Sequence, residues 1–270
     1  MSEGKIPLLQ HPLNEPSAFT ADALVSAVRS ERKLPVEAVP RVCVLEFDGD
    51  LTDWLVMKGY ATPCERWACF HTVMHTIEVG GKTCGIIART IGGPFAVLIA
   101  EQLKASGAEL VLGLTSAGRV SPSLPLPSLV IVQEAIRDEG TSYHYIAADN
   151  AVESDPDLVR TLADGISDLG LLVSSGRVWT TDAPCRETQQ QLDRYASEGV
   201  LAVEMQAASL LAFSKATGMP AGVVALVSNA VDHTENTFDK GPHDFGRRLI
   251  QAMCLAGIRY LDRRKARRSA

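Results

Sequence analysis

The sequence predicts an α/β fold in one domain, and three observations lead to that prediction. Short runs rich in β-branched residues alternate with longer amphipathic stretches, the pattern of strands in a mainly parallel sheet with helices packed on it. The chain has 270 residues, of which 46% are hydrophobic, so it can bury one substantial core. We see no repeat, low-complexity linker or change of composition that would divide it into two units.

Six apolar runs are expected to form the strands of the sheet. They lie at Val42–Leu45, Thr83–Ala88, Glu109–Leu114, Leu129–Val132, Val200–Glu204 and Gly222–Ser228. Short runs of this kind, bounded by polar residues, glycine or proline, are typical of buried strands.

Five stretches between these runs have the spacing of helices. They lie at Pro94–Ser106, Asp155–Asp168, Arg186–Glu198, Gln206–Thr217 and His243–Leu261. In the last of them Phe245, Leu249 and Met253 recur every four residues, so we expect one buried stripe. Asp155 precedes a proline and is expected to cap its helix, because a carboxylate accepts hydrogen bonds from the first turn.

Composition and charge indicate in which compartment the protein works and which classes of partner are excluded. No apolar run reaches the roughly eighteen residues of a membrane span, and residues 1–15 lack the order of a secretion signal. The six cysteines form no CxxC pair and mostly lie in apolar stretches, so we expect reduced thiols in a cytoplasmic protein. The net charge of −6 argues against a nucleic-acid partner, and the basic residues from Arg263 onward are expected to be a solvated helix end.

Polar residues follow several predicted strands, where ligands collect in open α/β sheets. Thr115–Gly118 offers hydroxyls and backbone N–H groups for an anion or a sugar, or else forms a tight turn. Arg137–Tyr145 is dense in polar and aromatic groups; it can stack on a base, or be an exposed loop anchored by two tyrosines.

Glu204 stands at the end of a predicted buried strand, just before a helix. Burying an unpaired carboxylate is costly, so Glu204 is expected to have a hydrogen-bond partner in the protein or in a ligand, unless it is simply an acid that starts the helix. Ser228 and Asn229 have the same placement after their strand, and the same two interpretations.

Six segments of the chain, taken together, resemble nucleoside phosphorylases. In chain order they are Gly92-Gly93-Pro94, Thr115–Gly118, Arg137–Tyr145, Trp179–Pro184 with Arg186–Thr188, Val203–Ala208 and Ser228-Asn229. Val203–Ala208 is similar to the Val-Glu-Met-Glu-Ala-Ala signature of the uridine-phosphorylase-like branch. The order of the segments is more specific than any one of them.

The resemblance implies a single α/β domain with a mixed central β-sheet flanked by helices. Its core would span about residues 42–261, with an N-terminal arm at 1–20 and a basic tail at 263–270. It also implies an enzyme without metal or organic cofactor that uses inorganic phosphate as co-substrate and works as a homodimer or a hexamer of dimers. Phosphate attacks the anomeric carbon of a nucleoside, and electron-rich groups stabilise the developing oxocarbenium ion.

The resemblance assigns roles to particular residues. Glu204 and Asn229 are the candidate catalytic residues; Met205, Gln206, Ser116 and Thr115 are expected to contact the sugar. Asp182, Arg186 and Tyr143 are expected near the base.

Three departures from the family pattern affect the chemistry. Gln206 replaces an acid that grips the sugar diol, and Asn229 replaces an acid that protonates the base in purine-cleaving members. The first loop, Glu46–Asp53, carries four acids and no arginine, and Val111–Leu114 is apolar where an arginine is expected. Binding of phosphate would then depend on an arginine from another part of the chain, and Arg89 and Arg137 are the candidates.

Two other functions fit the same residues. A nucleosidase would use water in place of phosphate, which the acidic first loop favours. A non-catalytic nucleoside binder would explain the amides at Gln206 and Asn229. His71 and His75 have the spacing of two metal ligands on a helix, but the residues around them favour a strand, so we predict no metal site.

Overall fold

The computed structural model describes residues 6–230 and 241–269. Its centre is one mixed sheet, and the predicted α/β class is confirmed. β1 (Val42–Glu46) lies between β4 (Lys82–Ala88) and β5 (Leu110–Arg119) and is parallel to both. β3 (Met74–Val79) and β2 (Thr62–Pro63) extend the sheet antiparallel beyond β4.

Five strands on the other side of the sheet close into a ring. β10 (Ala221–Ala230) pairs with β5 and with β6 (Ser128–Asp138), which in turn pairs with β8 (Leu172–Thr181). β9 (Ala202–Glu204) pairs with β8 on one side and with β5 on the other, which completes the ring. β7 (Ala151–Glu153) is an outer partner of β6.

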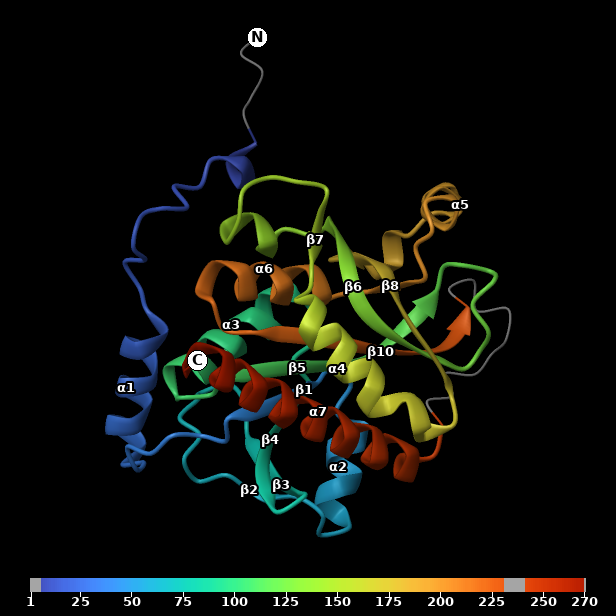
Figure 1. Cartoon of the computed structure of the whole chain (residues 1–270). Coiled ribbons are helices and arrows are strands. Elements are labelled where there is room, and N and C mark those ends of the chain that lie inside the picture. Colours follow the sequence, from blue (N-terminus) through green and yellow to red (C-terminus); the bar gives the residue numbers. More distant parts are fainter. Residues whose placement is uncertain (1–5, 231–240, 270) are drawn as a thin grey trace.

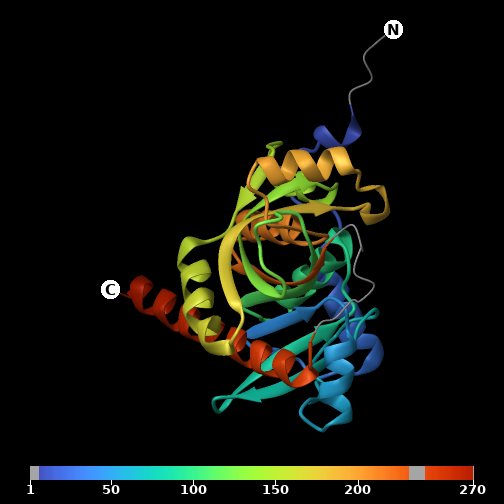
Figure 2. The same cartoon turned by 90° about the vertical axis from the view of Figure 1, so that its right-hand side faces the viewer.

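Helices cover both faces of the sheet (Figure 1). On one face lie α3 (Gly93–Ala105) and α6 (Ala207–Thr217), and α1 (Ala21–Arg32) packs against α3. On the other face, α4 (Pro156–Ile166) and the long α7 (His243–Ser269) lie side by side in both views (Figure 2), and α2 (Asp50–Met57) contacts α7. α5 (Gln189–Ser197) lies on the ring, away from α7.

Alternation along β1 explains the two cores. Cys43 and Leu45 belong to the core under α3 and α6, whereas Val42 and Val44 belong to the core under α4 and α7. This is the period-two pattern of a strand that is buried on both faces. The predicted stripe of Phe245, Leu249 and Met253 on α7 is confirmed, because all three are buried in the second core.

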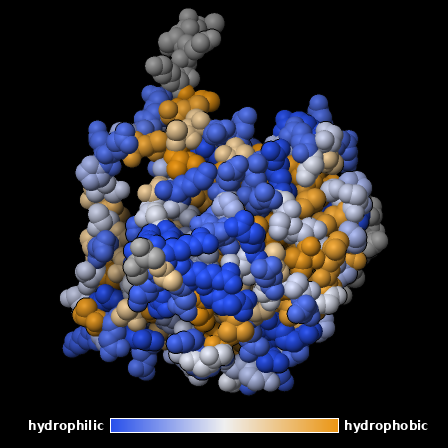
Figure 3. Space-filling model, in the orientation of Figure 1, coloured by the Kyte–Doolittle hydropathy of each residue, from blue (hydrophilic) through white to orange (hydrophobic). Residues whose placement is uncertain are grey.

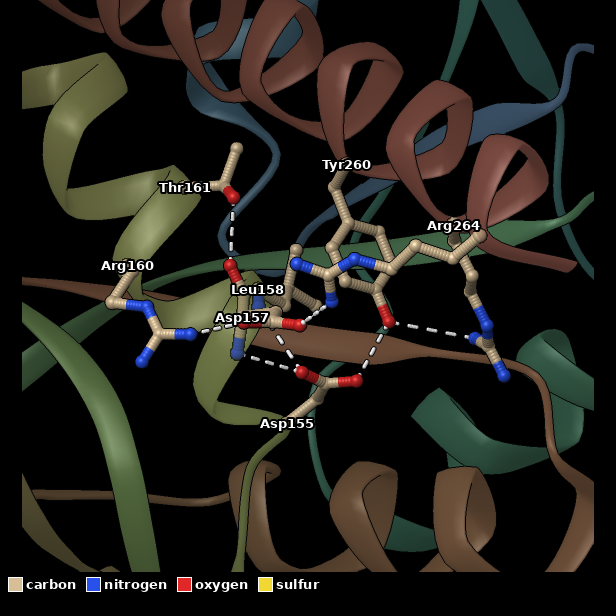
Figure 4. Close-up of polar contacts among 8 residues, drawn as sticks. Asp155, Asp157, Leu158, Arg160, Thr161, Tyr260 and Arg264 are labelled. Carbon is tan, nitrogen blue, oxygen red and sulfur yellow. Dashed lines mark hydrogen bonds and ion pairs between the residues drawn. The ribbon is translucent and has the colours of Figure 1, made fainter. Parts of the chain in front are cut away.

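A polar network joins α7 to the start of α4 (Figure 4). Asp155 accepts hydrogen bonds from the backbone N–H groups of Asp157 and Leu158 at 2.8 and 3.2 Å, which confirms the predicted cap, and it also accepts one from the Tyr260 hydroxyl at 2.8 Å. Arg264 donates to the same hydroxyl. The surface over the C-terminal part of α7 is strongly hydrophilic (Figure 3), so the basic residues that follow Arg263 continue the helix on the surface.

Two predicted strands are longer than expected, which changes the interpretation of two candidate segments. β5 continues to Arg119 and β6 to Asp138, so Thr115–Gly118 and Arg137-Asp138 lie in strands. The alternative that Thr115–Gly118 forms a tight turn was wrong, because these residues are extended in β5 and pair with β10.

Other elements were not predicted at all. They are β2, β7, β8, α1 and α2. The predicted strand around His75 is confirmed as β3, and His71 lies before it, so the two histidines do not share a helix. In the described part of the chain, no helix combines the length and the apolar character needed to cross a bilayer.

Candidate functional site

The candidate site lies where several strands end at one edge of the sheet. β1 and β5 are parallel, and β1 ends beside the middle of the longer β5. β9 runs antiparallel to β5 with Val203 opposite Gly118, so the segment after Glu204 continues along β5 toward Thr115. The strand order thereby brings the segments around residues 48, 116 and 206 together, although they are far apart in the sequence.

Glu204 is a fully buried acid whose oxygens are occupied by the chain itself. Oε1 accepts a hydrogen bond from the Thr180 hydroxyl at 2.5 Å, and Oε2 accepts from the backbone N–H groups of Gln206 and Ala207 at 2.7 and 2.8 Å. The expectation that this carboxylate has hydrogen-bond partners is confirmed. Glu204 therefore fixes the start of α6 and the turn that carries Met205.

Gln206 joins this carboxylate to the start of α3. The orientation of its amide follows from its neighbours: the nitrogen donates to Glu204 Oε2 at 3.2 Å and the oxygen accepts from the Gly92 N–H at 3.0 Å. The Thr115 hydroxyl lies 3.4 Å from the same amide. Gln206 is only 3% exposed, so its hydrogen-bonding groups are engaged within the protein.

Burial controls the ionisation of Glu204. Burial raises its pKa to about 7, while the hydrogen bonds from Thr180 and from the backbone N–H groups of Gln206 and Ala207 lower it. Since the folded pKa lies above the value of about 4.3 for an exposed Glu, unfolding releases a proton between these two pH values.

We therefore expect the free energy of unfolding to fall as the pH rises from about 4.5 to about 7, and then to level off. The fall attributable to Glu204 is at most about 4 kcal/mol, and a Glu204→Gln variant should lack it. Urea unfolding of both proteins at a series of pH values measures the difference. Parallel curves for the two proteins would contradict this account.

Asp48 and Ser116 meet on the opposite side of the site. Asp48 follows β1, and its Oδ1 accepts a hydrogen bond from the Ser116 hydroxyl at 3.1 Å. Thr115, next to Ser116 on β5, is buried and donates to the Ser116 carbonyl. A cavity of about 40 Å³ lies beside these residues, which is room for water molecules. Its polar wall includes Glu46, Asp48, Asp50, Thr115, Ser116 and His243, and its apolar wall includes Leu51, Leu114, Leu226 and Leu249.

Glu46, the last residue of β1, stabilises the rest of the first loop through hydrogen bonds to its carboxylate. Its carboxylate accepts from the backbone N–H groups of Gly49 and Thr52 at 2.7 and 3.2 Å and from the Thr52 hydroxyl at 2.9 Å. Burial raises the pKa of Glu46, and these three bonds oppose the rise. Glu46 thus caps α2 and sets the position of Asp48.

Arg89, a predicted phosphate ligand, lies at the rim of the first loop. It follows β4, its N–H donates to the Glu46 carbonyl at 3.0 Å, and its guanidinium pairs with Asp53 on α2. The structure thus places Arg89 near the site, in a pair with a carboxylate.

Arg137, the other predicted phosphate ligand, does not reach this site. Its guanidinium donates to the Ser142 hydroxyl at 2.8 Å and to the carbonyls of Ala147 and Ile146 at 2.7 and 3.3 Å. It also lies over the ring of Tyr143, at 4.3 Å from its centroid. Arg137 thus ties down the loop after β6, and the Tyr143 hydroxyl donates to the Arg137 carbonyl at 3.1 Å. The predicted contacts of Arg137 with phosphate and of Tyr143 with a base stay predictions.

The remaining predicted residues are distributed as follows. Met205 is half-buried in the turn after Glu204, and Asn229 is buried on β10, opposite Gly118 and within 3.4 Å of the Ser228 hydroxyl. Asp182 accepts from the Gly140 N–H at 2.9 Å, and Arg186 is exposed in the short 3₁₀ turn Pro184–Arg186. The predicted contacts of these residues with a base or a sugar stay predictions.

Two residues that hold parts of the candidate site in place were not identified from the sequence. Thr180 lies within a segment that carried the resemblance, but its hydrogen bond to Glu204 depends on the register of β8 against β9. Glu139 is a second buried acid, which accepts from the Ser209 hydroxyl at 2.6 Å and from the Ser142 N–H. It joins the loop after β6 to α6.

The structure also accounts for the apolar stretch where the resemblance expects an arginine. A Cβ atom on Gly113 would lie 2.9 Å from the ring of Phe47, which follows β1 and is 1% exposed. The phenyl ring thus occupies the space of a side chain at this position, and a large residue there would overpack the core.

Comparison with known proteins identifies the family. A family model described as the phosphorylase superfamily matches residues 41–262, close to the span of the resemblance found in the sequence. Guanosine phosphorylase of Halorubrum lacusprofundi is 26% identical over 147 residues, which are 54% of this chain and 61% of that protein. Uridine phosphorylase of Thermococcus kodakarensis is 26% identical over 166 residues, 57% of this chain and 60% of that protein.

A relative named as a purine nucleoside phosphorylase matches as well. Purine nucleoside phosphorylase of the DeoD type from Colwellia psychrerythraea is 29% identical over 164 residues, 58% of this chain and 68% of that protein. The chain thus spans about three fifths of the length of the first two relatives. Since the family model covers most of the chain, the chain belongs to the phosphorylase superfamily.

Proposed function

We propose that the chain cleaves the N-glycosidic bond of a nucleoside with inorganic phosphate as acceptor, giving the free base and a pentose 1-phosphate. One observation carries the proposal: the segment Glu204–Gln206 runs beside Thr115, whose hydroxyl lies 3.4 Å from the Gln206 amide, so two of the segments that carry the resemblance are in contact. The relatives named uridine, guanosine and purine nucleoside phosphorylase support this class of reaction.

The proposed reaction requires rigid, electron-rich groups next to the sugar, because they stabilise its developing positive charge. The C1′–N bond breaks with its electron pair on the base, which takes up a proton, and a phosphate oxygen forms the new bond to C1′. Met205 contributes a polarisable sulfur beside the sugar, and the buried network of Glu204 holds it in place. Asn229 orients the base by hydrogen bonds, which suits a pyrimidine or a 6-oxopurine because an amide donates no proton to the leaving group.

We further propose that the chain works as a homodimer or as a hexamer of dimers, as the resemblance implies. No organic cofactor or metal is required by the proposed reaction. Light scattering coupled to size-exclusion chromatography distinguishes these assemblies from a monomer.

The test is base release from a panel of purine and pyrimidine nucleosides, with and without inorganic phosphate, followed by chromatography. Release that requires phosphate and yields pentose 1-phosphate supports the proposal. Release at the same rate without phosphate overturns it, and binding of nucleoside without any release would indicate the non-catalytic binder.

A second candidate, hydrolysis of the nucleoside, is favoured by one observation at the same site. Asp48 accepts from Ser116 beside a cavity that has room for water, and Glu46 and Asp50 line the same wall. A carboxylate in this position can take a proton from an attacking water molecule, whereas it repels a phosphate dianion.

Asp48→Asn separates the two reactions because it has opposite effects on them. For hydrolysis, loss of the general base should reduce base release by about 100-fold or more. For phosphorolysis, loss of a like charge should lower the KM for phosphate and leave release intact. The matched control is Asp149→Asn on the exposed loop after β6, which should change neither quantity.

A further inference from the structure

Arg89 is held in an unusual backbone conformation at the edge of the site. Its φ is +61°, and among the described residues other than glycine only Lys33, which ends α1, shares a positive φ. Such a conformation costs on the order of 1 kcal/mol or more for a residue with a Cβ atom. Arg89 directly follows the last residue of β4, and its side chain lies against Gly49 of the first loop.

The first loop leaves room for this side chain. Gly49 has a φ of +93°, and a Cβ atom there would lie 2.5 Å from Cγ and 2.9 Å from Cζ of Arg89. Any other residue at position 49 would therefore push the arginine away. The loop next to Asp48 is shaped so that a guanidinium can lie directly on it.

The guanidinium is paired in a parallel, two-bond geometry with Asp53. Nη1 donates to Oδ1 at 3.0 Å, and Nη2 donates to Oδ2. Both side chains are more than half exposed, so solvent anions have access to the pair. The pair with Asp53 keeps the pKa of Arg89 raised, and Glu46 and Asp50 act on it in the same direction.

A two-bond pair with a carboxylate has the same donor geometry as a pair with phosphate. We propose that Asp53 occupies the anion-binding face of Arg89 until the phosphate co-substrate replaces it, so that Asp53 is a positioning residue that sets the affinity for phosphate. The inference rests on the proposed phosphorolysis. It explains how a loop lined by carboxylates admits a phosphate dianion: the Arg89 guanidinium at its rim changes partner from Asp53 to the incoming anion.

The experiment compares Asp53→Asn and Arg89→Gln with the wild type, through KM for phosphate, kcat, and phosphate binding by calorimetry. Asp53→Asn should lower the KM for phosphate by about fivefold, the effect of removing one exposed competing ion pair, with the change in KM rather than in kcat. Arg89→Gln should raise that KM by about tenfold or more. Adding Asp53→Asn to Arg89→Gln should have no further effect, because the guanidinium is already absent.

A matched control lies at the other end of the same strands. Arg41 and Glu109 form a two-bond pair of similar exposure at 2.8 and 3.1 Å, just before β1 and β5. Glu109→Gln should leave both KM and phosphate binding unchanged. Thermal unfolding of each variant shows that it is folded.

The outcomes separate the inference from the proposed function. Phosphate-dependent release with an unchanged or raised KM in Asp53→Asn overturns the inference alone. Release that is independent of phosphate in the wild type overturns the proposed function and the inference with it. A lowered KM in Asp53→Asn that persists in the Arg89→Gln background shows that Asp53 acts by simple charge repulsion and also overturns the inference.

Discussion

Replacing Glu204 with alanine is expected to lower the free energy of unfolding by about 3–5 kcal/mol and to abolish base release. The carboxylate is the shared acceptor for the Thr180 hydroxyl, for the backbone N–H groups of Gln206 and Ala207, and for the Gln206 amide. Each of these donors would be buried without a partner in the variant, and each unpaired donor costs about 1–3 kcal/mol. Urea unfolding measures the loss of stability.

Two further variants show that the effect comes from hydrogen bonding. Glu204→Gln keeps one acceptor oxygen and should be intermediate in stability, because its NH₂ group faces donors. Glu153→Gln, on the exposed face of β7, serves as the control and should be neutral. A stability of Glu204→Ala close to that of the wild type would mean that the four donors find other partners.

Replacing Gln206 with glutamate is expected to reduce kcat/KM by about tenfold or more at pH 8 and to have a smaller effect near pH 6. The new carboxylate could still accept from the Gly92 N–H, but its second oxygen would lie where the amide nitrogen now sits, 3.2 Å from Glu204 Oε2. Two buried carboxylates at this distance cannot both be ionised, so the pair would retain a proton up to a raised pH. Above that pH, repulsion would displace the turn that carries Met205.

The pH profile of kcat/KM for Gln206→Glu against the wild type measures this effect, and Gln133→Glu on the exposed side of β6 is the control. A gain of activity at pH 8 would contradict the prediction. It would show that the side chain at position 206 leaves Glu204 and contacts the sugar hydroxyls directly.

The extent of β5 shows where sequence reasoning about the fold reached its limit. The apolar run predicts the strand up to Leu114, but Thr115–Gly118 has the small polar residues of a turn. These residues stay extended because β10 pairs along them and β9 pairs with Gly118 and Arg119, and both partners are distant in the sequence. β8 was missed for the same reason: Ser174–Arg177 interrupts its apolar pattern, and pairing with β6 supplies what the local sequence lacks.

The candidate site shows a similar division. That Glu204 would be buried and hydrogen-bonded follows from its place between an apolar strand and a helix, and the structure confirms it. The sequence does not identify Thr180 as the hydrogen-bond partner of Glu204, because this contact depends on the register of β8 against β9. The direction of the Arg137 side chain could not be inferred either, because a residue near the end of a strand can face either side of the sheet; it faces the loop that follows β6.

The candidate site can form during folding only when the ring of β5, β10, β6, β8 and β9 closes. β9 is only three residues long and pairs with β5, more than eighty positions earlier in the chain, and with β8. Contacts between such distant segments form late, because the intervening chain must first be ordered. The turn that carries Met205 is therefore assembled in one of the last steps of folding. Because Trp179 packs against Val203 of β9 and Val120 beyond β5, its buried environment should form in the same step as the ability to bind a nucleoside.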